Sequence, residues 1–85
     1  MKTLAKALIE TAAFIDLSDD DVIAPDDAVR ELEGIAYTLH SASPEEIAAI
    51  REALREMVDA SQTDAAREVA RKFSAAFLES IGVTP

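Results

Sequence analysis

The segment SASPEEIAAIREALREMV, residues 41–58, decides the fold class because it joins a helix start signal to an amphipathic repeat. Ser43 is followed by Pro44 and, three residues after the serine, by Glu46. Serine and glutamate at this spacing form a capping box, and proline suits the first helical position. The residues that then recur at helical spacing are Ile47, Ile50, Leu54, Met57, Val58 and Ser61. This pattern predicts a helix over residues 44–60.

Two segments before this helix show the same periodicity. Residues 2–15 are apolar over an unusually wide arc, which is typical of a deeply buried helix or of a subunit interface. Their predicted inner face consists of Leu4, Leu8, Thr11, Ala12 and Ile15. Pro25 suits the first turn of a helix over residues 25–41, where Asp26 and Asp27 complement the positive end of the dipole. The predicted inner face of this helix is Ala28, Val29, Leu32, Ile35, Ala36 and Leu39.

The last helix is predicted over residues 64–81. It begins near Thr63, and Gly82 is well placed to end it in a left-handed cap, with Val83 folding back. Its predicted inner face is Ala66, Val69, Ala70, Phe73, Ala76 and Phe77, with Leu78 outside it. Short connections place consecutive amphipathic helices antiparallel. The sequence therefore predicts an all-α fold, a small antiparallel three- or four-helix bundle formed by residues 1–85 as a single domain.

The net charge of −9 is concentrated in one stretch of the chain. Residues 16–46 contain ten acidic residues against one basic residue, Arg30, and the charges of all other residues sum to zero. Six of these acids are aspartates between Asp16 and Asp27. Phosphates require cationic surface, so nucleic acid is disfavoured as a partner. A basic protein or a cation is the partner that this field attracts.

Composition disfavours several other classes. The chain contains no cysteine, which excludes disulfides, iron–sulfur clusters and thiolate zinc sites. No apolar run is long enough to span a bilayer, and Glu10 and Thr11 interrupt the one stretch that could pass for a signal peptide. We therefore expect a cytoplasmic protein that uses no cofactor and has no membrane partner.

The aspartate-rich segment can be compared with a calcium loop. Its oxygen ligands would be, at positions one, three, five, seven and twelve, Asp16, Ser18, Asp20, the Val22 carbonyl and Asp27. Over these twelve residues the chain resembles an EF-hand loop. It departs from the pattern at position six, where Asp21 replaces glycine, and at position twelve, where Asp27 replaces a bidentate glutamate. A solvated joint between two helices is the favoured interpretation, and divalent-cation binding is the less favoured one.

The sequence shows no catalytic constellation. A nucleophile and its base would have to come from His40, the only histidine, together with a serine and an acid, and no spacing brings such residues together. Two glycines are too few for a phosphate-binding loop. Acyl carrier proteins are also small, acidic and helical, but the place of their Asp-Ser-Leu attachment motif is taken here by Ala24-Pro25-Asp26. We therefore predict a non-enzymatic protein without catalytic residues.

One face of the helix over residues 25–41 is a candidate recognition surface. It lies opposite the inner face and is formed by Asp26, Asp27, Arg30, Glu33, Gly34 and Tyr37. Tyrosine is enriched at binding hot spots, and Tyr37 is rimmed here by carboxylates. Glycine destabilises a helix interior by about 1 kcal/mol relative to alanine, so Gly34 suggests close approach by another chain or by helix 2–15.

In size, acidity and helical class the chain is similar to bacteriocin-nuclease immunity proteins, in which tyrosines lie beside an acidic helix. Glu33 and Tyr37 carry this similarity, which is one of physical character and not of a shared motif. It implies an inhibitor or immunity protein that docks its acidic second helix on a basic toxin or enzyme. The alternative is a homo-oligomeric structural or regulatory protein, such as a homodimer, that uses helix 2–15 as its interface. A third hypothesis is an adaptor that binds an amphipathic helix in a groove.

Overall fold

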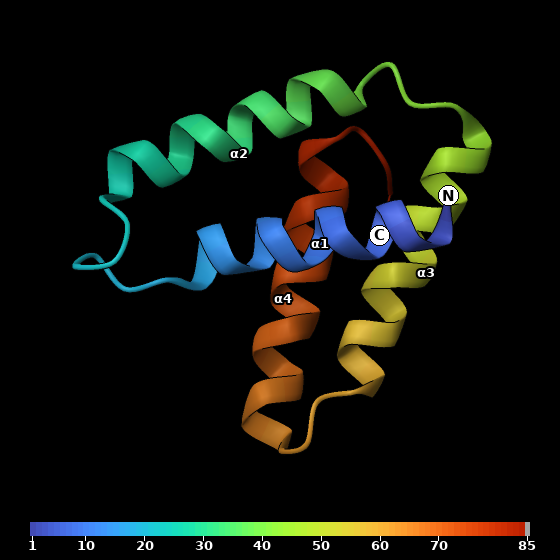
Figure 1. Ribbon diagram of the computed structural model, residues 1–85. Coiled ribbons are helices and arrows are strands. Elements are labelled where there is room, and N and C mark those ends of the chain that lie inside the picture. Colours follow the sequence, from blue (N-terminus) through green and yellow to red (C-terminus); the bar gives the residue numbers. More distant parts are fainter. Residues whose placement is uncertain (85) are drawn as a thin grey trace.

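A computed structural model describes residues 1–84 of the chain (Figure 1). Within these residues four helices form: α1 (Lys2–Leu17), α2 (Pro25–Leu39), α3 (Pro44–Asp59) and α4 (Asp64–Ser80). Each helix begins at the residue that the sequence predicts, and the all-α fold is confirmed. None of the helices described is both long enough and apolar enough to cross a membrane.

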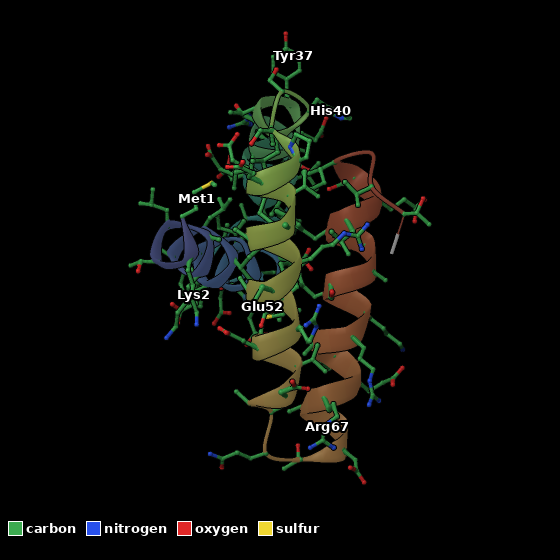
Figure 2. The ribbon with its side chains drawn as sticks, turned by 90° about the vertical axis from the view of Figure 1, so that its right-hand side faces the viewer. Met1, Lys2, Tyr37, His40, Glu52 and Arg67 are labelled. Carbon is green, nitrogen blue, oxygen red and sulfur yellow. The ribbon has the colours of Figure 1, made fainter. Side chains whose placement is uncertain are left out.

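The helices form two antiparallel pairs that cross each other. α3 and α4 run side by side in opposite directions, α1 lies across them, and α2 extends along the top of the molecule (Figures 1 and 2). α1 packs most extensively on α3, whereas α2 packs mainly on α1 and only sparsely on α4. α2 is therefore the outermost helix and the one least enclosed by the others.

Three helices supply the core. The buried residues are Ala5, Ile9 and Ala12 on α1, Ile50, Ala53 and Leu54 on α3, and Ala70, Phe73, Phe77, Leu78 and Ile81 in and just after α4. The rings of Phe73 and Phe77 lie 5.7 Å apart in a tilted arrangement, within the range that favours aromatic pairs. α2 contributes no fully buried residue, although Leu32, Ile35 and Leu39 pack half-buried against the edge of this core.

α1 turns a different face to the core from the predicted one. Leu4 is 74% exposed and Thr11 is exposed as well, whereas Ile9, which lies outside the predicted face, is buried. Ala12 is buried as predicted. The buried face is therefore rotated by about one residue, or about 100°. The physical reason is that α1 is apolar over an unusually wide arc, so that periodicity cannot select one face within it. Its two buried alanines let the backbone of α1 come close to α3, where Ala53 is also buried.

The predicted inner face of α4 also needs correction. Val69 and Ala66 are exposed, and Leu78, predicted outside the inner face, is buried. The first turns of α4 extend well beyond the region where α1 crosses the pair, whereas the later turns lie at this crossing and continue towards α2 (Figure 1). Burial on α4 is consequently concentrated in its C-terminal half.

The C-terminal end of α4 forms the predicted left-handed cap. Gly82 has a φ of 81°, and its N–H donates to the carbonyl of Glu79 at 3.0 Å. The Val83 N–H donates to the carbonyl of Leu78 at 2.9 Å. These two bonds are those of a Schellman motif, and they return the chain towards the core, against which Val83 packs.

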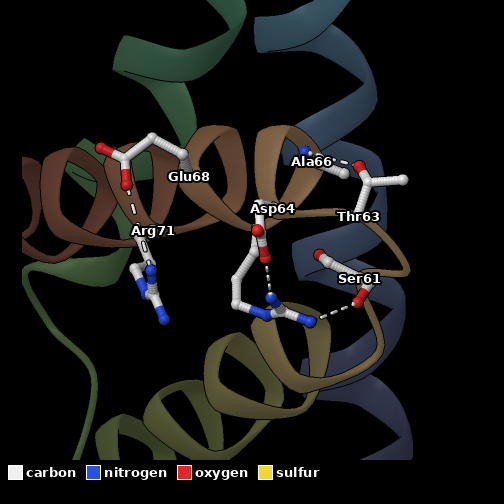
Figure 3. Close-up of polar contacts among 7 residues, drawn as sticks. Ser61, Thr63, Asp64, Ala66, Glu68 and Arg71 are labelled. Carbon is white, nitrogen blue, oxygen red and sulfur yellow. Dashed lines mark hydrogen bonds and ion pairs between the residues drawn. The ribbon is translucent and has the colours of Figure 1, made fainter.

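Local caps begin α3 and α4. The Ser43 hydroxyl accepts from the Glu46 N–H at 3.2 Å, and the Glu46 carboxylate accepts from the Ser43 N–H at 2.9 Å, so the predicted capping box is confirmed. The hydrogen bond that the Glu46 carboxylate accepts from the Ser43 N–H, and after it the nearby Ser43 hydroxyl, hold the pKa of Glu46 below its ordinary value of 4.5. At the start of α4 the Thr63 hydroxyl accepts from the Ala66 N–H at 3.0 Å (Figure 3).

Arg67 bridges the two ends of the connection between α3 and α4. Its guanidinium donates to the Asp64 carboxylate at 2.9 Å and to the Ser61 carbonyl at 3.1 Å (Figure 3). The connection is therefore held both by a cap and by a bridging side chain. Within the described chain no comparable side-chain bridge spans the connection between α1 and α2.

Candidate interaction surface

The outer face of α2 is open to solvent. Tyr37 is 83% exposed and projects away from the molecule at the top of Figure 2. Gly34 is also exposed, and a Cβ atom added to it would meet nothing within 4 Å. The suggested approach of helix 2–15 to Gly34 is therefore wrong. Neither residue is explained by packing inside the fold, so both remain accessible to a partner.

The acidic residues of the segment 16–46 are all exposed: Asp16, Asp19, Asp20, Asp21, Asp26, Asp27, Glu31, Glu33, Glu45 and Glu46. Within residues 1–84 the only ion pair that any of them forms is that of Asp27 with Arg30, at 3.0 Å. The remaining ion pairs of the described chain lie elsewhere: Lys2–Glu56, Arg55–Glu52, Arg67–Asp64 and Arg71–Glu68. Within residues 1–84, four of the seven acidic residues outside the segment thus form an ion pair, whereas only one of the ten inside it does.

A groove of about 460 Å³ lies between α2 and α4. Its apolar lining consists of Val29, Leu32 and Ala36 on α2 and Phe73, Ala76 and Phe77 on α4. The groove exists because α2 packs chiefly on α1, which leaves the side of α2 that faces α4 uncovered. Val29 shows the result most clearly, since it was predicted to face inward and is 54% exposed.

The polar groups of the groove are acidic or neutral in character. They are Asp16, Glu33, Tyr37, His40 and Ser80. Among the residues that the structure describes, no lysine or arginine lines the groove. Its volume falls in the range of about 300–1,000 Å³ that is usual for ligand sites. The groove can therefore receive apolar groups while its carboxylates attract positive charge.

The structure divides the predicted partner-binding residues into two groups. Glu33 and Tyr37 line the groove. Asp26, Asp27, Arg30 and Gly34 lie outside it on the exposed surface of α2. The apolar groove residues of α4, Phe73, Ala76 and Phe77, were predicted only as core. Periodicity marks an apolar helix face, but it does not show whether another helix covers that face or leaves it open. One feature of the sequence could have indicated the groove. On α2, the apolar residues Val29 and Ala36 lie at the edge of the apolar stripe, next to Glu33 and Tyr37, so apolar and acidic side chains meet there.

The spacing that resembles an EF-hand loop is not accompanied by a converging ligand set. Asp16 lies in the last turn of α1, and Asp27 lies in the first turn of α2, where it pairs with Arg30. The Ser18 hydroxyl donates to the carbonyl of Phe14. Across residues 1–84, no three histidine or carboxylate side chains are grouped so as to hold a metal ion.

The groove also brings together Asp16, His40 and Ser80, the residue types of a nucleophile–base–acid set. The Ser80 hydroxyl, however, donates to the carbonyl of Phe77 at 2.7 Å. No hydrogen bond of the described chain links it to His40, and the His40 ring lies 3.4 Å from the position of a Cβ on Gly82. The arrangement lacks the serine–histidine contact that would activate a nucleophile.

Comparison of the chain with protein-family models, with curated proteins and with solved structures found no match.

Proposed function

We propose that this protein is a non-enzymatic binding module that docks the acidic surface of α2 and the α1–α2 connection on a basic protein. Its biological role in this proposal is that of an inhibitor or immunity protein for a cationic toxin or enzyme. The observation that carries the proposal is the uncompensated charge of residues 16–46, whose ten carboxylates are all exposed and of which one forms an ion pair within residues 1–84.

Long-range charge determines how such a module finds its partner. An exposed surface of one sign raises the association rate with an oppositely charged protein, and salt reduces this effect. Tyr37, exposed beside the carboxylate of Glu33, adds an aromatic side chain of the kind that anchors protein interfaces. The proposal therefore combines steering by carboxylates with one rigid apolar anchor.

The test begins with affinity capture at low salt on the immobilised protein, followed by purification of the basic protein that binds. Association is then measured by surface plasmon resonance as a function of salt. The informative variant reverses charge in the acidic surface: Asp26→Lys, Glu31→Lys and Glu33→Lys together. The matched control makes the same change in charge elsewhere, at exposed acids without an ion pair in the described chain: Glu10→Lys, Asp59→Lys and Glu79→Lys.

We expect the association rate of the surface variant to fall by about tenfold or more at low salt, and that of the control to fall far less. Equal losses in both variants would show that only net charge matters. Failure to recover any basic protein, with no effect of the surface variant, would contradict the proposal.

A second candidate function rests on α1. Leu4 and Phe14 are 74% and 61% exposed, and they share the outer face of α1 with Ala7 and Thr11, with no charged residue between them on that face. This observation favours the homo-oligomer alternative, with α1 as the interface between two copies. Light scattering after size exclusion tests it: a dimer that dissociates in the Phe14→Lys variant would support it, and a monomer at all concentrations would exclude it.

A further inference from the structure

We infer that the groove between α2 and α4 receives the apolar stripe of one amphipathic helix of the partner, whose lysine or arginine side chains flank that stripe and face Asp16 and Glu33. This inference rests on the proposed function, because it specifies which element of the basic partner is recognised.

The walls of the groove suit a helix. α2 and α4 form its two sides, its lining is largely apolar, and an amphipathic helix binds by laying its apolar face into a hydrophobic groove. Phe73 and Phe77, both buried, supply a firm floor. Val29 and Tyr37, both exposed, form a wall on the α2 side that can be covered without disturbing the core.

The charges of the groove select a cationic ligand. Asp16 comes from the end of α1 and Glu33 from the middle of α2, so two carboxylates from different helices belong to one apolar groove. Within residues 1–84 neither lysine nor arginine lines the groove to neutralise them. A helix with a neutral or acidic rim would leave these carboxylates without partners or repelled, whereas lysines beside its apolar stripe would pair with them.

A second copy of the chain does not fit this requirement. Each copy carries a net charge of −9, and the helix with the acidic surface is the one that forms a wall of the groove. Docking copy on copy through the groove would bring like charges together, which is costly at an interface. The partner chemistry that the groove selects is therefore that of a different, basic protein.

Synthetic peptides test the inference directly with the full-length protein. The probe is a helical peptide of about 18 residues made of leucine and lysine, with leucines at i, i+3, i+4 and i+7. One control peptide has the same composition in an order that forms no apolar face. A second control replaces lysine by glutamate in the amphipathic order. Binding is measured by fluorescence anisotropy at low and at physiological salt, and the contact surface is mapped by amide chemical shifts of the labelled protein.

We expect the amphipathic leucine–lysine peptide to bind about tenfold or more tightly than its reordered isomer. The shifted amides should lie on both walls, near Val29 and Ala36 on α2 and near Ala76 and Ser80 on α4. Equal binding of the two isomers, shifts confined to residues 16–27, or no binding of either peptide would overturn the inference. Equal binding of the leucine–glutamate peptide would overturn the selection for positive charge.

Matched variants separate the groove from the acidic field. Ala76→Trp fills the groove, whereas Ala75→Trp places the same side chain at the neighbouring exposed position of α4, outside it. Glu33→Lys changes a groove carboxylate, whereas Glu31→Lys changes one on the same helix outside it. Val29→Asn makes the exposed wall polar and serves in place of Ala76→Trp if the latter does not fold by circular dichroism.

We expect Ala76→Trp and Glu33→Lys to weaken binding of the leucine–lysine peptide by about tenfold, and their controls to weaken it by far less. The tryptophan variants keep every charge of the protein. If Ala76→Trp and Ala75→Trp bind alike, the groove inference fails while docking through charge still stands. If charge reversal on α2 leaves the captured partner's binding unchanged, the proposed function fails.

Discussion

α2 and α3 follow each other along the chain and have similar lengths, but they differ in their N-terminal caps and in how much of their surface is buried. α3 begins with a capping box and buries Ile50, Ala53 and Leu54. α2 begins at Pro25 after an N-cap residue, Ala24, that supplies no side-chain hydrogen bond, and it has no fully buried residue. One helix is thus secured both locally and by packing, and the other is held mainly by its half-buried stripe.

The same contrast separates the two hairpin connections. The connection between α3 and α4 is fastened by Thr63 and by the two-sided contacts of Arg67 (Figure 3). The connection between α1 and α2 contains Asp19, Asp20 and Asp21, with Asp16 and Asp26 on the helix turns beside it. Its turn is formed by backbone hydrogen bonds to the Asp19 carbonyl, at 2.9 and 3.1 Å. Acidic charge is thus concentrated in the less secured region. This arrangement leaves the core of α1, α3 and α4 as a support and α2 as the surface that can meet a partner.

The largest expected effect on stability comes from replacing a leucine by alanine, and the same change can be made in α3 and in α2. Leu54→Ala removes a side chain that is 1% exposed, and it should lower the free energy of unfolding by about 2–5 kcal/mol. Leu32→Ala acts on the half-buried stripe of α2 and should cost about 1 kcal/mol. Urea unfolding followed by circular dichroism measures both. Equal losses would mean that α2 belongs to the core as fully as α3 does.

The two glycines should respond in opposite directions to alanine. Gly82→Ala forces a side chain into a left-handed conformation beside the His40 ring and should cost about 1–2 kcal/mol. Gly34→Ala adds a methyl group in open space within a helix and should stabilise the protein by about 1 kcal/mol. Thermal unfolding distinguishes these outcomes. A destabilising Gly34→Ala would show that position 34 is packed against other atoms in solution, contrary to the open space around it in the structure.

Removing the N-cap of α3 should destabilise the protein, and adding an N-cap to α2, which lacks one, should stabilise it. Ser43→Ala should cost about 0.5–2 kcal/mol because it removes the cap of α3. Ala24→Ser supplies a cap to α2 and should stabilise it by up to about 1 kcal/mol. Ser41→Ala, in the same connection as Ser43 and without a side-chain hydrogen bond in the described chain, is the control and should change stability little. Loss of stability in Ala24→Ser would contradict the idea that α2 lacks local fastening.

The smallest effect is the pH dependence of the capping box. The pKa of Glu46 is lowered in the folded protein by its hydrogen bonds with Ser43, so its ionised form favours folding. This contribution is complete above the ordinary value of 4.5 and is lost as the pH falls below it. The stability of the protein relative to Glu46→Gln should therefore shrink on acidification, as measured by thermal unfolding between neutral pH and pH values below 4.5. Glu45→Gln controls for the loss of one charge, and a difference that stays constant with pH would refute the role of ionised Glu46.

The starts of the helices could be predicted because their causes are local. Serine or threonine at a cap and proline at the first position act on neighbouring backbone groups. Pro25, Pro44 and Asp64 accordingly begin helices in the structure as predicted. The left-handed conformation of Gly82 was predictable for the same reason.

The faces of the helices could be predicted only in part. α3 offers one clear apolar stripe, and its Ile50 and Leu54 are buried as expected. α1 has several possible apolar stripes, and the stripe that is buried differs from the predicted one. Which stripe is buried depends on the surface of α3 against which α1 packs. Val29 was predicted to lie inward on α2, yet it is exposed along the groove because α2 leans on α1 more than on α4.

By itself the sequence determined the helical class, the residues at which helices begin and the segment that holds the excess negative charge, because each depends on residues that are neighbours in the chain. Only the tertiary structure decided which side of α1 is buried, that Leu78 belongs to the core, and that Glu33 and Asp16 share an apolar groove with Phe77. The physical reason is that burial and clefts arise from how helices cross, and crossing is selected by the combined packing of surfaces far apart in the chain.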